Sequence, residues 1–210
     1  MEQILFTFTS LLAMINPIAS IPVYISLTQA LSIKTRRKVI LTSVGAAFVA
    51  MIIFAFAGQA IFSFFSINVN SLRVVGGVLF FIMGYEMLRG RTVPKKLDEE
   101  TDDNYGKDIA VTPLGIPMIC GPGAITMVTL FMQEAQTPIQ QAEVAAGILL
   151  VCAATAIIFA LGEGLLRFMG KVGASVMMRL MGLIMMLIAV EFLFAGLPHY
   201  IQLIVNNVNF

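Results

Sequence analysis

The chain has 210 residues, of which 59% are hydrophobic and only 12% are charged, and its net charge is +1. Soluble domains carry about twice that share of charged residues, so the composition excludes a soluble globular protein and indicates a polytopic membrane protein. Cys120 and Cys152 both lie in apolar runs, and the sequence contains no Cys/His cluster or phosphate-binding loop. We therefore expect no metal, no cofactor, no nucleic-acid partner and no enzymatic activity.

Six apolar segments are long enough to cross a bilayer, which takes about 20 helical residues. We predict an all-α membrane protein whose six transmembrane helices lie at 4–31, 39–65, 72–89, 109–133, 142–166 and 176–198. Three spans fall in each half of the chain. The predicted organisation is a first repeat at 1–97, a charged loop at 98–108 and a second repeat at 109–210.

Positive side chains gather at alternate connections. The connections at 32–38, 90–107 and 167–175, with the adjoining span ends, hold 12 of the 13 Lys and Arg residues, and Arg73 alone lies on the other side. The positive-inside rule therefore predicts these three connections in the cytoplasm and both termini outside. We expect the highly charged third connection to be a solvated loop, with partner docking as the alternative.

The first span contains an asparagine and two prolines, Asn16, Pro17 and Pro22. Proline removes a backbone donor, which is costly in hydrocarbon. However, asparagine is a strong N-cap, and proline is favoured at the first helical position. Asn16-Pro17 therefore predicts the start of a second half-helix inside the membrane.

A shift of 105 residues places Pro17 on Pro122, in Gly121-Pro122-Gly123. Because each half holds three spans, the second half would enter the membrane from the opposite side, as in transporters built from inverted repeats. Helices 1 and 4 are then both broken mid-membrane. Three further pairs share the offset: Gly77 with Gly182, Gly84 with Ala189, and Glu86 with Glu191.

The two predicted breaks each create a helix N-terminus, which carries free N–H groups and about half a positive elementary charge. Together they would form a cradle for a small anionic group such as a carboxylate. A purely structural kink is the alternative, and hydroxyl groups near a helix start often bond their own backbone. The residues predicted to bind substrate are Asn16, Pro17, Ile18, Ala19, Ser20, Gly121, Pro122, Gly123, Ala124 and Thr126.

Two further groups of residues suggest roles inside the membrane. Glu191 has no cation near it in sequence, and a charge at that depth costs at least about 2.5 kcal/mol, so a proton-coupling role is considered beside a simple protonated or paired state. Glu86 lies close to Arg89, where an ion-paired end residue is the first expectation. The small residues of the repeat are spaced for close helix packing: Gly77, Gly84, Gly182 and Ala189.

The chain resembles the MarC family, which includes the SnatA-type small neutral amino acid transporters. The resemblance covers essentially the whole chain, and its motifs are the segments 16–22, 34–38, 72–77, 117–123 and 179–184. It implies a six-span inner-membrane protein with broken first and fourth spans. For some members it also implies transport of small neutral amino acids such as glycine and alanine. Glu86 and Glu191 are outside the family pattern, so the resemblance gives them no role.

These observations predict a secondary transporter that works by alternating access. The expected partners are the lipid bilayer, a small neutral amino acid and a proton or sodium ion, and an oligomer is compatible with the sequence. One alternative is a channel or facilitator for a small solute, because paired half-helices also build pores. Another is a non-transporting protein that assembles other membrane proteins.

Overall fold

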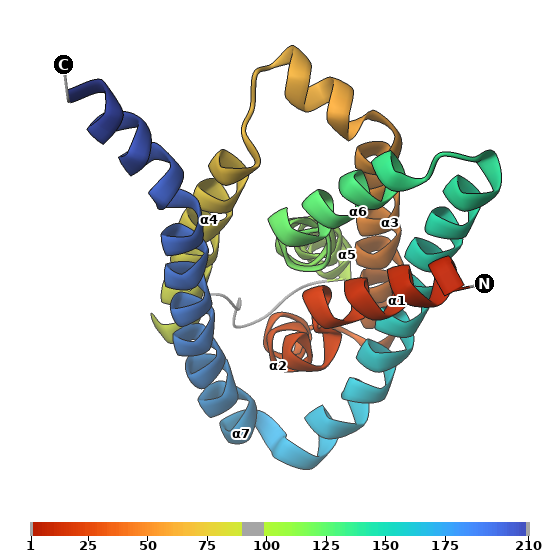
Figure 1. Cartoon of the computed structure of the whole chain (residues 1–210). Coiled ribbons are helices and arrows are strands. Elements are labelled where there is room, and N and C mark those ends of the chain that lie inside the picture. Colours follow the sequence, from red (N-terminus) through yellow and green to blue (C-terminus); the bar gives the residue numbers. More distant parts are fainter. Residues whose placement is uncertain (1, 90–98, 209–210) are drawn as a thin grey trace.

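The computed structural model describes residues 2–89 and 99–208, and within these ranges it contains helices and no strand (Figure 1). The π-helical segment η1 contains two prolines and is kinked at both. In chain order the elements are α1 (Glu2–Ile15), α2 (Pro17–Thr28), α3 (Ile33–Phe64), α4 (Val69–Arg89), α5 (Glu99–Ile109), η1 (Ala110–Ile119), α6 (Pro122–Glu134) and α7 (Pro138–Val208).

The described helices account for six membrane spans when each bent pair is taken as one span. Four stretches are long and apolar enough to cross a bilayer alone, and they are Ile33–Phe64, Asn70–Arg89, Pro138–Gly162 and Arg179–Pro198. The other two spans are bent pairs: α1 with α2 at 47°, and Asn104–Ile119 with α6 at 60°. The all-α fold and the breaks in the first and fourth spans are therefore confirmed.

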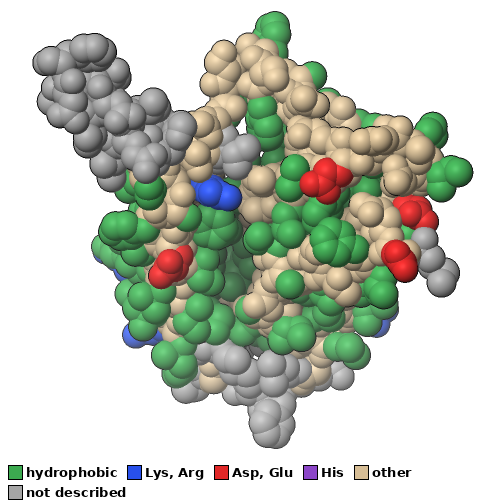
Figure 2. Space-filling model, viewed as in Figure 1, with side chains coloured by type: hydrophobic (Ala, Val, Ile, Leu, Met, Phe, Trp, Pro, Cys, Tyr) green, Lys and Arg blue, Asp and Glu red, His purple; other side chains and the backbone are tan. Residues whose placement is uncertain are grey.

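The outer surface of the spans is apolar. Leu41 of α3 is 72% exposed and Phe194 of α7 is 69% exposed. Figure 2 shows hydrophobic side chains over most of the visible face, with few charged groups between them. A surface of this kind is costly in water and suited to lipid.

The half-helix α2 is the most enclosed element of the interior. All seven residues from Pro22 to Thr28 are buried, so this part of the helix is surrounded by protein around its whole circumference. Tyr24 stacks on Phe159 of α7, with 5.0 Å between the ring centroids. This packing holds α2, the half-helix that follows the first break, in a fixed position.

The C-terminal end of α2 is held by Arg36 of α3. The Arg36 guanidinium donates through Nε to the carbonyl oxygens of Thr28 and Leu31, each at 3.0 Å, and through Nη2 to that of Gln29 at 3.0 Å. The last carbonyl groups of a helix lack partners and carry partial negative charge. Arg36 therefore satisfies them and ties α2 to α3.

Helix α4 runs beside the C-terminal half of α7, and small residues set their spacing (Figure 1). A Cβ atom placed on Gly84 would lie 2.6 Å from the carbonyl oxygen of Gly182, and one on Gly77 would lie 2.9 Å from that of Ala189. The 105-residue shift places Gly77 on Gly182 and Gly84 on Ala189. It therefore relates the Gly84–Gly182 contact to the Gly77–Ala189 contact, with the two helices exchanged. Reciprocal contacts are expected around a two-fold axis. The inverted relation of the two halves stays a prediction.

Two connections differ from the predicted loops. In the third, residues 99–109 form helix α5, while 90–98 lie outside the described residues. Acidic residues at its start and Lys107 in its last turn complement the helix dipole, and Gly106 packs against Thr35 of α3. In the fifth, the backbone of α7 remains helical through 167–175 while the helix changes direction (Figure 1). That stretch contains no proline or asparagine to end a helix.

Candidate functional site

The first break is a single residue that caps its own helix. Asn16 has φ 44° and ψ 63°, in the left-handed region that asparagine tolerates better than most residues. Its side-chain oxygen Oδ1 accepts a hydrogen bond from the N–H of Ala19 at 3.3 Å. Its carbonyl oxygen accepts from both the N–H and the hydroxyl of Ser20, each at 3.3 Å. The N–H groups of Ala19 and Ser20, in the first turn of α2, therefore already have acceptors.

The second break is longer and leaves donors free. Thr112 and Ile116 of η1 are extended, as expected for residues that precede prolines. Gly121 is also extended, with φ −88° and ψ 176°, and no side chain caps the start of α6. In the part of the chain that the structure describes, the N–H groups of Gly123 and Ala124 have no acceptor.

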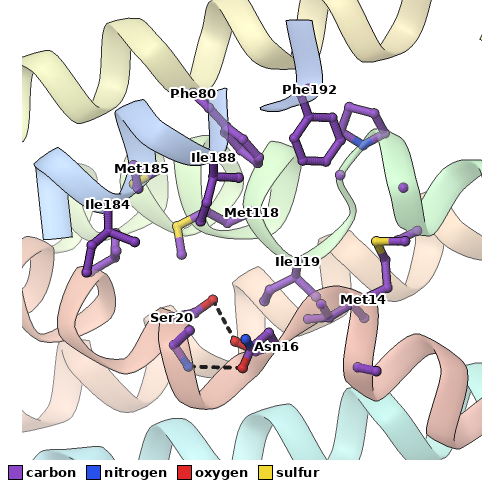
Figure 3. Close-up of a pocket in the computed structure, with 18 of the residues that line it drawn as sticks. Met14, Asn16, Ser20, Phe80, Met118, Ile119, Ile184, Met185, Ile188 and Phe192 are labelled. Atoms are coloured by element: carbon purple, nitrogen blue, oxygen red, sulfur yellow. Dashed lines mark hydrogen bonds between the residues drawn. The ribbon is translucent and has the colours of Figure 1, made fainter. Parts of the chain in front are cut away.

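The two breaks line the same cavity, which has a volume of about 330 Å³. Asn16 and Ser20 lie on one side of it, and Phe80 and Phe192 lie on the other (Figure 3). The second break lines it through Gly121, Pro122, Gly123 and Ala124. Figure 2 shows a hollow on the molecular surface between the α4–α7 pair and the central helices. The structure thus brings together two segments that are 105 residues apart in sequence.

Close contacts at two glycines hold the breaks around the cavity. A Cβ atom on Gly123 would collide with the sulfur of Met14, which belongs to the last turn of α1. A Cβ atom on Gly76 of α4 would collide with the ring of Pro122. The absence of a side chain at both positions allows α1 and α4 to approach the start of α6.

The remaining wall of the cavity is apolar. Phe80 of α4 and Phe192 of α7 meet edge to face, with 5.7 Å between their centroids. Methionine and isoleucine side chains complete this wall (Figure 3). No charged side chain lines the cavity among the described residues. Any charge on a bound molecule would therefore meet backbone dipoles and the Asn16 amide.

Most of the predicted binding residues lie at the cavity. Three do not line it: Pro17 is buried, Ile18 is 69% exposed, and Thr126 donates its hydroxyl to the carbonyl oxygen of Pro122 at 2.8 Å. The predicted residues that line the cavity are Asn16, Ala19, Ser20, Gly121, Pro122, Gly123 and Ala124.

The two membrane glutamates are placed differently. Both side chains are exposed, but Glu191 of α7 lines no described cavity, whereas Glu86 of α4 lines a second cavity. Among the described residues, no group of three or more His, Cys, Asp or Glu could hold a metal ion.

Sequence reasoning missed the apolar wall because its side chains look like ordinary membrane-helix residues: Met14, Phe80, Met118, Met181, Met185 and Phe192.

Comparisons with known proteins agree over the whole length. The pattern described as "MarC family integral membrane protein" matches residues 1–201. A UPF0056 membrane protein of Pyrococcus abyssi is 36% identical, covering 94% of this chain and 97% of its own. The UPF0056 membrane protein YvbG of Bacillus subtilis is 34% identical, covering 92% and 93%. No solved structure matches the chain.

Proposed function

The chain belongs to the MarC family of integral membrane proteins, and we propose that it is a secondary transporter of small neutral amino acids across the inner membrane. The first, third and fifth connections lie in the cytoplasm and both termini lie outside, in accord with the distribution of Lys and Arg. The observation that carries the proposal is the single cavity between the two breaks.

The start of α6 binds the substrate carboxylate. The N–H groups of Gly123 and Ala124 have no acceptor among the described residues, and they lie at the positive end of the helix dipole. On the opposite side of the cavity, the oxygen of the Asn16 side chain is already used by Ala19. Its amide NH₂ group is left as a further donor for the carboxylate.

The cavity wall favours a neutral side chain on the substrate. Because no charged residue lines the cavity among those described, an acidic or basic side chain would be desolvated without a partner. The volume of about 330 Å³ suits a small molecule. Glycine and alanine satisfy both conditions.

Transport proceeds by rocking one repeat against the other around this cavity. The α4–α7 pair contributes Phe80 and Phe192 to the wall, while the breaks belong to the central helices. Each repeat supplies one break and one of these two phenylalanines, so a relative movement of the repeats would open the cavity to alternate sides. Since the sequence has no ATP-binding motif, a proton or ion gradient, or the gradient of the solute itself, supplies the energy.

An uptake panel with purified protein in liposomes tests the proposal. Radiolabelled glycine and alanine should accumulate inside, and lysine and glutamate should not. A protonophore or the removal of sodium should abolish accumulation. Uptake that only equilibrates would identify a channel or facilitator instead. If correctly folded protein takes up no amino acid, the proposal is wrong.

A further inference from the structure

A second cavity, with a volume of about 530 Å³, lies between α2, α4, α5 and η1. It adjoins the first cavity, because Val23 lines both. Pro117 lines the second cavity, and the next residue, Met118, lines the first. The two spaces are therefore separated by little more than these side chains.

The position of the second cavity follows from α2. Ser20 lines the first cavity and Leu27 lines the second. Seven residues of helix correspond to about 10 Å along the axis. Because α2 runs from the first break toward the basic first connection, the second cavity lies between the first cavity and the proposed cytoplasmic face.

Glu86 is the one charged side chain that lines either cavity among the described residues. The sequence suggested an ion pair between Glu86 and Arg89. Instead, the Arg89 guanidinium lies over the Tyr85 ring, 5.4 Å from its centroid, and no ion pair of Glu86 is present among the described residues. Its carboxylate is thus positioned to meet a cation that enters the cavity.

We propose that the second cavity is an amino acid binding site on the cytoplasmic side, in which Glu86 binds the ammonium group of the substrate. This inference rests on the proposed transport of amino acids. A free amino acid carries both charges at neutral pH, and the first cavity offers donors for its carboxylate but no charged acceptor for its ammonium group. Glu86 supplies that acceptor on the way to or from the cytoplasm.

Kinetics in oriented membrane vesicles test the role of Glu86. In inside-out vesicles, Glu86→Gln should raise the KM for glycine about tenfold or more, the expected size for loss of one charge-assisted hydrogen bond. Glu86→Asp should recover part of this loss. In right-side-out vesicles, the KM of Glu86→Gln should stay close to that of the wild type. The matched control is Asp108→Asn, because Asp108 is an exposed carboxylate of α5 that lines neither cavity.

Thiol labelling tests the cavity itself. With Cys120 and Cys152 replaced by alanine, Glu86→Cys should react with a water-soluble cationic thiol reagent, and glycine should slow the reaction. An unchanged KM for Glu86→Gln, or labelling that glycine does not slow, would overturn the inference while wild-type uptake leaves the transport proposal intact. An absence of wild-type uptake would instead overturn the transport proposal, and this inference with it.

Discussion

Both helix breaks have a proline at the first helical position. They differ in whether the backbone N–H groups that follow this proline have acceptors. At the first break, Asn16 turns through the left-handed region and uses its own side chain to cap α2. At the second break, Gly121 is extended and offers no side chain to α6. The first break therefore satisfies the N–H of Ala19, whereas at the second break neither the N–H of Gly123 nor that of Ala124 has an acceptor among the described residues.

This difference assigns unequal roles to segments that look alike in sequence. A capped helix start is rigid and offers few N–H groups to a ligand, whereas an uncapped start that faces a cavity is a potential anion site. We infer that the start of α6 contributes most of the affinity for the substrate. The start of α2 mainly determines the shape of the cavity. The first three predictions below change one side at a time, and the fourth changes a residue outside both cavities.

The largest expected effect comes from Gly121→Ala. The added Cβ atom would lie 2.6 Å from the carbonyl oxygen of Pro117, so the backbone of the second break must move, at a cost of about 1–3 kcal/mol. Glycine uptake per folded molecule should fall at least about tenfold, since misplacement by about 1 Å disrupts a positioned site. The control is Gly45→Ala on α3, where nothing lies within 4 Å of the new atom. Equal uptake by the two variants would contradict the account.

A smaller effect is expected at the first break, and it should appear in stability. Asn16→Ala loses the cap, worth about 1 kcal/mol, and forces a left-handed conformation on alanine, worth about another 1 kcal/mol. Asn16→Gly keeps the conformation free of strain and should lose only a few tenths of a kcal/mol relative to the cap. Thermal unfolding of the purified variants measures both. If they lose the same stability, the left-handed residue is not the cause.

Ser20 and Thr126 each donate a hydroxyl hydrogen bond to a backbone carbonyl oxygen four residues earlier, and they differ in whether they line the cavity. Ser20 lines the cavity, whereas Thr126 does not. Ser20→Ala should raise the KM for glycine about two- to fivefold, the size expected for a neutral hydrogen bond. Thr126→Val should leave the KM within about twofold, because it removes only a bond to the carbonyl oxygen of Pro122. The reverse order would place the substrate deeper along α6.

The smallest effect is expected from Glu191→Gln. Glu191 is exposed and lines neither cavity, so uptake and its sensitivity to a protonophore should stay within about twofold of the wild type. Uptake that persists but no longer responds to the protonophore would assign proton coupling to Glu191.

The breaks could be predicted from the sequence because their cause is local. Pro17 and Pro122 each follow a residue suited to the N-cap position, and the rule needs no tertiary contact. The difference between the breaks is not local. It depends on the left-handed conformation of Asn16 and on the contact of Gly123 with Met14, which packing determines. Apolar wall residues such as Phe80 carry no signal of their own because lipid-facing positions use the same side chains.

In the charged third connection, the structure differs from what the local composition predicts. Its composition indicates a solvated loop, yet residues 99–109 form a helix that packs against α3. Charge alone did not exclude the helix, because four of its five acidic residues lie in its first half and Lys107 lies in its last turn. The kinked segment η1, which contains Pro113 and Pro117, was also not predicted.

Equilibrium binding of radiolabelled glycine to the purified protein tests the central claim most directly. We predict saturable binding that unlabelled alanine displaces, that Gly121→Ala abolishes and that Gly45→Ala preserves. Saturable binding that Gly121→Ala leaves unchanged, or no binding by the folded wild-type protein, would contradict a substrate site between the two breaks.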